Sequence, residues 1–192
     1  MKKILVACEY SQIVMTAFLE AGVDAYSCDI IPTSGPYPER HYQMVAIECS
    51  QIQKWDLIIA HPPCTYMSIA GARHMFKGGT LNETRLEKAM QAKSFFMYWY
   101  NWNKSPIAIE NPIPLKIVGL PIETQRICIS QFGIPYTKKI CLWLKGIPPL
   151  IPNVDYVINT KQFVSTKHDG KGRSRFFPEV AKAMAEQWLP IL

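Results

Sequence analysis

A cysteine stands directly behind two prolines at the end of an apolar run. The stretch "WDLIIAHPPCTYMSIAG" covers residues 55–71, and in it Pro62 and Pro63 separate the apolar residues 57–60 from Cys64. A cysteine thiolate is intrinsically very nucleophilic and can form covalent intermediates. A thiol at the mouth of a strand can therefore attack a ligand that is bound at the carboxyl end of that strand.

Four interpretations of residues 61–64 compete. The simplest is a rigid Pro-Pro turn with an incidental buried cysteine. A zinc deaminase needs a His-x-Glu motif and a second cysteine three residues after the first, but the residue at that position is Met67. The comparable turn of an amino-group methyltransferase has Asp or Asn first and Tyr or Phe last, and His61 and Cys64 supply neither function well. The fourth interpretation is addition of the thiolate to carbon 6 of a pyrimidine, which makes carbon 5 nucleophilic.

The pyrimidine chemistry also needs a group that bonds ring nitrogen 3. Residues 106–112, "PIAIENP", form an apolar run that ends in Glu110 and Asn111. A carboxyl group at the end of a neighbouring strand serves this purpose best. A cysteine at one strand end and a glutamate at another is a more specific signal than either residue alone. We expect His61 to pack or hydrogen-bond beside the nucleophile and not to bind a metal.

Strands and helices alternate along the chain, which predicts an open α/β sheet with helices on both faces. Ligands in such folds bind at the carboxyl ends of the strands. The patterns predict strands at 3–7, 23–30, 55–61, 106–110 and 140–144. They predict helices at 12–21 with Ser11 as the N-cap, from a Thr80 capping box to about 102, at 122–132, and at 179–189 after Pro178. The expected loops are 32–43, 71–81 and 145–178, the last with a short strand near Phe163.

Length and composition favour a single folded domain over residues 1–192. Hydrophobic residues make up 48% and charged residues 19%, and the net charge of +6 suggests either a polyanionic partner or an ordinary basic surface. No apolar run is long enough for a membrane span. The start, "MKKILVAC", has an apolar run too short for a signal peptide, so we expect a cytoplasmic protein. The six cysteines include no Cys-x-x-Cys pair, and we expect no metal site.

Three segments resemble motifs of the DNA (cytosine-5) methyltransferases. "DLIIAHPPCTYMSIAG" resembles the catalytic motif D-L-L-x-G-G-P-P-C-Q-x-F-S-x-A-G, and "AIENP" resembles the Glu-Asn-Val motif. "FGIPYTKKICLWL", residues 132–144, resembles the segment YGIPQxRxRxY. The chain is also similar to short phage-encoded proteins labelled cytosine methyltransferase-like, which would place it in a host cytoplasm. The resemblance implies a class I, Rossmann-like methyltransferase fold and methyl transfer from S-adenosylmethionine to carbon 5 of cytosine.

The resemblance also implies a set of site residues. The implied catalytic residues are Cys64 as nucleophile, Glu110 as partner of the ring nitrogen, and Lys138 near the base carbonyl or a phosphate. Substrate contacts are expected from Ser68, Asn111, Lys139, Arg173 and Arg175. Cofactor contacts are expected from Cys8, Ser11, Asp29, Ile30 and Pro62, with the methionine carboxylate at the helix start after Ser11 and the ribose hydroxyls on Asp29.

Two departures from the family bear on cofactor and substrate. The family's donor loop reads Phe-x-Gly-x-Gly-Gly, whereas residues 7–12 contain no glycine, which would let the backbone approach the cofactor closely. Residues 145–178 are too few for the family's target-recognition domain, but "STKHDGKGRSR" is a basic loop that can bind phosphate. We expect single- or double-stranded DNA as the substrate. A pyrimidine nucleotide such as dCMP, or a non-catalytic binder of nucleic acid or S-adenosylmethionine, remains an alternative.

Overall fold

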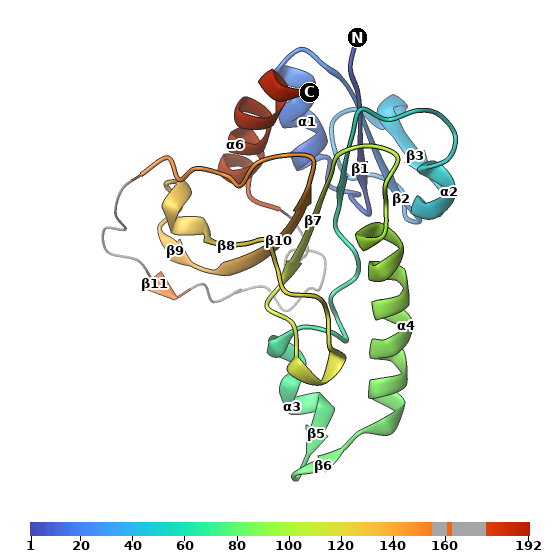
Figure 1. The fold of residues 1–192 in the computed structure, drawn as a ribbon, viewed down its shortest axis with the longest axis vertical. Coiled ribbons are helices and arrows are strands. Elements are labelled where there is room, and N and C mark those ends of the chain that lie inside the picture. The colour runs from blue at the N-terminus through green and yellow to red at the C-terminus, as the bar shows by residue number, and fades with distance from the viewer. Residues whose placement is uncertain (155–160, 163–175) are drawn as a thin grey trace.

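A seven-stranded sheet forms the centre of the computed structural model, which describes residues 1–154, 161–162 and 176–192. The strand order is β3-β2-β1-β4-β7-β10-β8 (Figure 1). β10 runs antiparallel to both β7 and β8, and the other neighbours are parallel. The strands are β1 Lys3–Ala7, β2 Asp24–Asp29, β3 His41–Gln43, β4 Leu57–Ala60, β7 Ile107–Pro112, β8 Gln125–Cys128 and β10 Lys139–Lys145.

The remaining elements are helices and two small two-stranded sheets. β5 (Phe76–Lys77) pairs with β6 (Thr80–Leu81), and β9 (Tyr136–Thr137) pairs with β11 (Lys161–Gln162). The described α-helices are α1 Ile13–Glu20, α2 Ala46–Cys49, α3 Ala72–Met75, α4 Glu83–Tyr100 and α6 Pro178–Trp188. Short 3₁₀ helices cover Pro38–Arg40, Ile69–Gly71, Lys116–Val118, Ile129–Phe132 and Leu189–Ile191.

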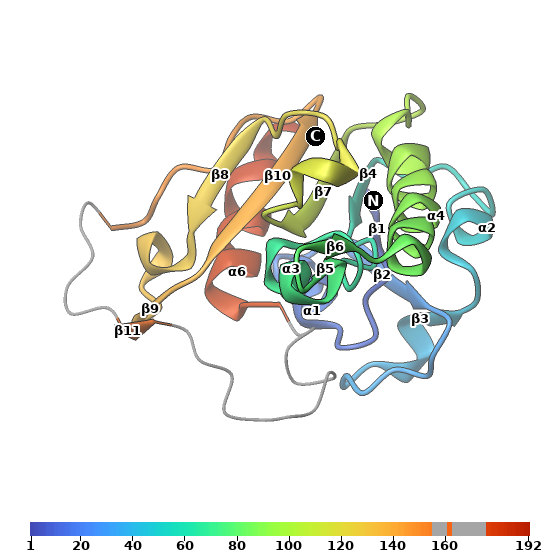
Figure 2. The same cartoon turned by 90° about the horizontal axis from the view of Figure 1, so that it is seen from below.

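Two apolar clusters cover the two faces of the sheet. Figure 2 shows α1 and α6 on one side of the sheet and α2 and α4 on the other. Successive strand residues point to opposite faces, so Ile4 packs in the cluster with α1 and α6, while Leu5 packs in the cluster with α2 and α4. The centre of β4 is buried on both faces, as expected for a parallel strand with helices on each side. The predicted open and mostly parallel α/β sheet with helices on both faces is confirmed.

The element predictions differ in how well they hold. The strands expected at 3–7 and 140–144 and the last helix are confirmed within one residue or so. The helix expected over 122–132 is wrong: β8 and a 3₁₀ helix lie there, because β10 offers an antiparallel edge with which residues 125–128 pair. The loops expected at 32–43 and 71–81 are also wrong in part, since the first contains β3 and the second contains α3, β5 and β6.

Both predicted helix caps need correction. The side chain of Asn82, and not Thr80, caps α4 by accepting the N–H of Arg85. α1 begins at Ile13, and its N-cap residue, Gln12, makes no side-chain capping hydrogen bond. Ser11 is therefore not the cap of α1.

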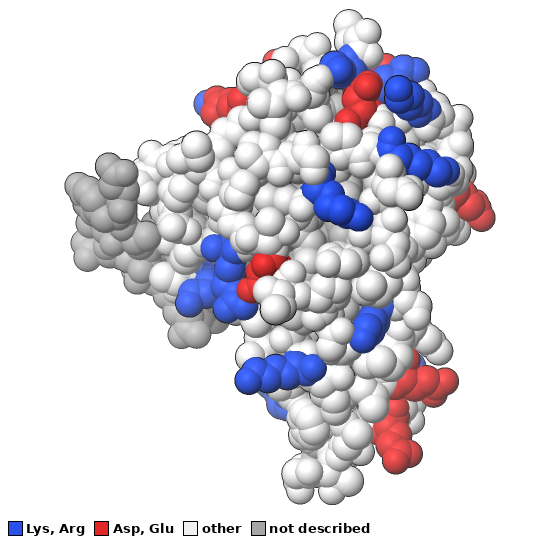
Figure 3. Space-filling view, in the orientation of Figure 1, with Lys and Arg blue, Asp and Glu red and all other residues white. Residues whose placement is uncertain are grey.

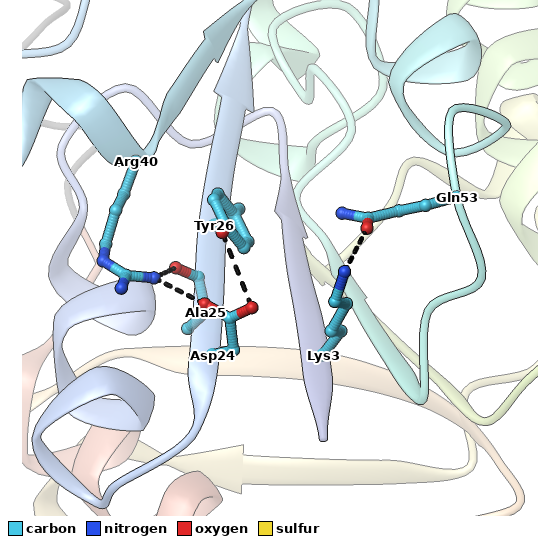
Figure 4. A network of polar contacts seen from close by, with 6 residues as sticks. All are labelled: Lys3, Asp24, Ala25, Tyr26, Arg40 and Gln53. Carbon is cyan, nitrogen blue, oxygen red and sulfur yellow. Dashed lines mark hydrogen bonds and ion pairs between the residues drawn. The ribbon is translucent and has the colours of Figure 1, made fainter. Parts of the chain in front are cut away.

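The amino ends of β1 and β2 carry a polar network (Figure 4). Arg40 donates to Asp24 at 2.7 Å and to the carbonyl of Ala25 at 3.3 Å, and Tyr26 donates to Asp24 at 3.5 Å. The ammonium of Lys3 donates to Oε1 of Gln53, in the segment before β4, at 2.7 Å. These contacts lie at the strand ends opposite to Cys64, so we assign them to stability and not to chemistry.

Within the described part of the chain, no helix combines the length and the apolar character needed to cross a membrane.

Candidate active site

The turn after β4 is held between the neighbouring strands. The N–H of His61 donates to the carbonyl of Ala7 at 2.9 Å, which extends the pairing of β4 with β1 by one residue. The side-chain amide of Asn111 donates to the carbonyl of Pro62 at 2.8 Å. Asn111 is only 1% exposed, so in this structure it braces the turn that carries Cys64. The apolar run and the two prolines thus deliver the cysteine to the carboxyl end of the sheet.

Arg85 of α4 holds the next part of this turn. The carbonyl of Cys64 accepts the N–H of Ser68 at 3.0 Å, and the Ser68 side chain is buried. Arg85 donates to the carbonyl of Thr65 at 2.8 Å, and its guanidinium lies 5.0 Å from the centre of the Tyr66 ring. The backbone on both sides of the thiol is therefore tied to other elements, while the Cys64 residue itself stays half-buried.

Cys64 and Glu110 lie close enough to influence each other. Burial raises the pKa of the Cys64 thiol, the negative charge of Glu110 raises it further, and the positive charge of Lys138 lowers it. The ammonium of Lys138 also lies 4.8 Å from the centre of the Phe177 ring. The structure therefore brings the three predicted catalytic side chains into one electrostatic neighbourhood, with Cys64 as the protonated thiol at neutral pH.

Glu110 is hydrogen-bonded to His61 in the same site. The distance between Nδ1 of His61 and Oε2 of Glu110 is 3.0 Å, and the two side chains are 13% and 14% exposed. Nε2 of His61 is buried and has no hydrogen-bond partner among the described residues. The ring of Phe176 lies 5.0 Å from the imidazole ring. His61 is therefore a hydrogen-bonding residue beside the nucleophile, as its sequence position indicated.

Glu9 occupies the start of α1. Its two carboxylate oxygens accept the N–H groups of Val14 at 2.7 Å and Met15 at 3.1 Å, and the hydroxyl of Ser11 lies 3.5 Å away. Burial raises the pKa of the Glu9 carboxyl, while the nearby His61 and these two N–H groups act in the opposite direction. The helix N-terminus that was predicted to receive the methionine carboxylate is thus already capped by a carboxylate of the chain itself.

The loop between β1 and α1 has a glycine-like backbone without glycine. Cys8 and Gln12 have φ angles of 62° and 58°, in the left-handed region that side chains rarely adopt. The buried side chain of Gln12 donates to the carbonyl of Tyr37 at 2.7 Å and accepts its N–H at 2.9 Å. A Cβ atom at Gly35 would lie 2.4 Å from Oε1 of Gln12. The segment around Gly35 therefore packs directly on this loop and needs a glycine to do so.

The residues predicted to hold S-adenosylmethionine fit its nucleoside but not its carboxylate. Asp29 ends β2 with a partly exposed side chain that accepts the N–H of Ile31 at 3.2 Å, and Ile30 is 69% exposed. An accessible carboxylate beside an exposed apolar side chain suits ribose hydroxyls and a base. The start of α1 does not suit a second carboxylate, because Glu9 has taken its N–H groups. Ser11 therefore loses the predicted role of guiding the donor's carboxylate to that helix.

The two neighbouring lysines lie in different surroundings. Lys138 is half-buried and acts on the thiol of Cys64, whereas Lys139 is exposed. Lys139 lines a surface hollow of about 500 Å³ together with Arg126, Ile127, Cys128, Ser130, Gln131 and Thr137. Figure 3 shows a group of basic side chains over the region of β8 and β10, beside an acidic one. Arg126 is paired with Glu123, so Lys139 supplies the unopposed charge of this hollow among the residues that line it.

Arg173 and Arg175 lie outside the described residues. The short strand expected near Phe163 is confirmed by β11, which ends at Gln162, directly before that residue. Among the residues that are described, no group of three or more His, Cys, Asp and Glu side chains could hold a metal ion.

Sequence reasoning missed the roles of Glu9 and Arg85 and the link between His61 and Glu110. Glu9 follows an apolar strand directly, and a carboxylate at a strand end before a helix is a signal that could have marked it. Arg85 carried no such signal, because its contact with Thr65 joins α4 to a turn 20 residues away. His61 stands where the resembled catalytic motif has glycine, and this substitution was the available sign.

No protein-family model matches the chain, and no curated protein matches it either. Two solved structures are similar in fold at 13% sequence identity each. One is an E. coli prophage protein described as a DNA modification methyltransferase, with a TM-score of 0.42. The match covers 75% of this chain and 46% of that protein. The other is a substituted variant of Spodoptera frugiperda DNMT2, with a TM-score of 0.35. That match covers 84% of this chain and 53% of the variant. The chain spans about half the length of these two proteins, and such low scores say nothing of its substrate.

Proposed function

We propose that the chain transfers a methyl group from S-adenosylmethionine to carbon 5 of cytosine in DNA, through a covalent adduct at Cys64. The observation that carries this proposal is the placement of Cys64 and Glu110 at the carboxyl ends of the adjacent strands β4 and β7, with Lys138 beside them. A thiol, a carboxyl group and an ammonium are the three groups that addition to a cytosine ring needs.

Each of the three groups has a distinct part in the addition. The thiolate of Cys64 forms a bond to carbon 6 of the base, and Glu110 provides the proton that ring nitrogen 3 takes. Lys138 is positioned to stabilise the thiolate before the addition. The negative charge of Glu110 opposes thiolate formation, so a neutral, protonated Glu110 favours both steps at once.

The donor would supply only the methyl group, and this chain's own residues would hold its nucleoside. Asp29 would accept the ribose hydroxyls and Ile30 would cover the base. Cys8 and Pro62 follow the neighbouring strands β1 and β4, and we propose that they contact the donor between Asp29 and Cys64. The methionine carboxylate would not bind at the start of α1, because Glu9 caps that helix.

DNA is favoured over a free nucleotide by the basic residues around the site. Lys139 is exposed beside a surface hollow, and Arg173 and Arg175 belong to the basic segment "STKHDGKGRSR" that is proposed to bind phosphate. Ser68 and Asn111, which hold the turn of Cys64, are proposed to shape the side of the site that meets the base. A flipped base must leave its stack, which costs a few kcal/mol in duplex and favours a single-stranded substrate.

The second candidate function is a non-catalytic nucleic-acid binder that keeps this fold. The specific observation in its favour is Glu9, which fills the helix start where the donor's carboxylate was expected. It leaves the arrangement of Cys64, Glu110 and Lys138 without a use.

Exchange of the cytosine 5-hydrogen with water tests the proposal without any donor. Once the Cys64 sulfur is bound to carbon 6, carbon 5 behaves as an enamine carbon and takes a proton from water. Carbon 5 then loses its tritium to water, and departure of the sulfur restores the ring, so tritium is released. We expect release from a single-stranded oligonucleotide by the natural chain and none by Cys64→Ala. Glu110→Gln should slow release by about 10² or more, the usual contribution of a positioned acid or base.

A second arm uses an oligonucleotide with 5-fluorocytosine together with S-adenosylmethionine, which should trap a covalent complex through Cys64. Exchange without trapping would refute the donor and keep the pyrimidine chemistry. The absence of both from the natural chain would refute the proposed function and leave the binder. Faster exchange on dCMP than on an oligonucleotide would identify the nucleotide as the substrate.

A further inference from the structure

Glu110, the proposed acid, is hydrogen-bonded to the largely buried side chain of His61. One oxygen of Glu110, Oε2, is bonded to Nδ1 of His61 at 3.0 Å. The charge of Glu110 also raises the pKa of the Cys64 thiol, so the same carboxyl group bonds the imidazole and influences the nucleophile. A catalytic acid that is only 14% exposed exchanges protons with water less readily than a surface carboxyl does. It therefore benefits from a neighbour that can hold a proton for it.

Imidazole is the side chain that gains and loses a proton near neutral pH. Two acidic groups act on His61: Glu9, after β1, interacts with it electrostatically, and Glu110, on β7, is hydrogen-bonded to it. Cys64 and Lys138 join this group of charges because both Glu110 and Lys138 act on the Cys64 thiol. Phe176 covers the ring at 5.0 Å, and Nε2 is buried without a hydrogen-bond partner among the described residues. The Nδ1–Oε2 bond is thus the polar contact through which the described residues engage this ring.

We propose that His61 is a positioning residue that keeps a proton available to Glu110, so that the two side chains together act as the acid for ring nitrogen 3. This inference rests on the proposed function and deepens it. It assigns to His61 a part that glycine, the residue at this place in the resembled motif, cannot have.

The proton and electrons balance in this scheme. The thiol of Cys64 first loses its proton to water. As a lone pair of the resulting thiolate forms the bond to carbon 6, the electron pair between carbons 5 and 6 moves to the bond between carbons 4 and 5. The electron pair between carbon 4 and nitrogen 3 moves onto nitrogen 3, which takes the proton held by the pair of Glu110 and His61. The pair is left as a carboxylate and a neutral imidazole. When the carbon–sulfur bond breaks, nitrogen 3 returns the proton to the pair.

The test is the pH profile of the donor-free exchange of the cytosine 5-hydrogen. His61→Asn keeps an N–H near the position of Nδ1, but its amide does not titrate. We expect His61→Asn to lose at least about tenfold in rate near pH 8.5 and much less near pH 6, where protons from the solution are more abundant and a proton held by His61 matters less. His74→Asn, on the exposed α3 segment, is the matched control and should follow the natural profile.

A rate ratio between His61→Asn and the natural chain that stays constant with pH would overturn the inference, because a purely structural role lowers the rate equally at every pH. If the natural chain exchanges the hydrogen and this ratio is constant, only the proposed role of His61 is refuted, and the proposed function stands. No exchange by the natural chain refutes the proposed function, and the inference with it. Thermal unfolding checks that the variant is folded, and His61→Gln, judged by the same ratio, replaces His61→Asn if that variant does not fold.

Discussion

At the scale of single residues, the reactivity of Cys64 reports on its two charged neighbours. Burial and Glu110 raise the pKa of this thiol, and Lys138 lowers it. Only the thiolate is alkylated, so the rate at a given pH below the pKa follows the thiolate fraction. Glu110→Gln removes a negative charge, lowers the pKa of Cys64 and should speed alkylation. Lys138→Met removes a positive charge, raises this pKa and should slow alkylation, each by roughly threefold to tenfold.

The measurement is the alkylation rate of the Cys64 peptide by mass spectrometry near pH 8, where the natural thiol is mostly protonated. Lys139→Met is the matched control, because Lys139 is exposed and is not among the charges that shift the pKa of Cys64. Equal rates for Glu110→Gln and the natural chain would contradict the electrostatic coupling between Glu110 and Cys64.

At the scale of elements, the loop after β1 and the segment around Gly35 are built as one unit. A methyl group at Gly35 would lie 2.4 Å from Oε1 and 2.5 Å from Cβ of Gln12. Gln12 is buried, so it has little room to move. We expect Gly35→Ala to lower the free energy of unfolding by about 1–3 kcal/mol, the usual cost of overpacking.

A double-mutant cycle identifies the cause of this loss. Gln12→Gly removes the side chain that the new methyl group meets, and its φ of 58° is one that glycine adopts freely. The cost of Gly35→Ala should therefore shrink in the background of Gln12→Gly. Gly22→Ala serves as the control, because no atom lies within 4 Å of its added Cβ, and its cost should not depend on residue 12. An unchanged cost of Gly35→Ala in the Gln12→Gly background would exclude this contact as the cause.

At the scale of the whole molecule, the strand order decides which segments meet. β1, β4 and β7 are adjacent, so the residues that follow or end them, Glu9, Cys64 and Glu110, share one edge of the sheet. Nucleic acid that reaches this edge meets Lys138 and Lys139. Because backbone contacts position a protein but do not read sequence, we expect DNA binding that is weakly sequence-selective and strongly dependent on salt.

The expected salt effect is quantitative. Each phosphate contact that is lost reduces the slope of log K against log salt by about 0.9 on duplex DNA. Lys139→Gln, and Arg173→Gln with Arg175→Gln, should each lower the slope in fluorescence titrations. Lys54→Gln should not, since Lys54 is exposed before β4, at the other end of that strand from Cys64. Binding that is independent of salt would contradict the assignment of DNA as the partner.

The sequence by itself determined where the main strands lie along the chain. It also determined that Cys64 and Glu110 stand at the carboxyl ends of two of them. Apolar runs that end in Pro62-Pro63-Cys64 and in Glu110-Asn111 are local patterns, and a strand exposes at its carboxyl end whatever residue follows its apolar core. The alternation of strands and helices was likewise enough to predict an open sheet with helices on both faces.

Only the tertiary structure decided the contacts between segments far apart in the chain. His61 meets Glu110 across 49 residues, and Arg85 reaches Thr65 across 20. Residues 125–128 are a strand because β10 pairs with them, although their own pattern suggested a helix. Glu9 displaced the predicted role of Ser11 because its carboxylate fits the free N–H groups of α1. In each case a partner elsewhere in the chain outweighed the local preference, because a buried polar or backbone group must find a hydrogen bond wherever the fold places one.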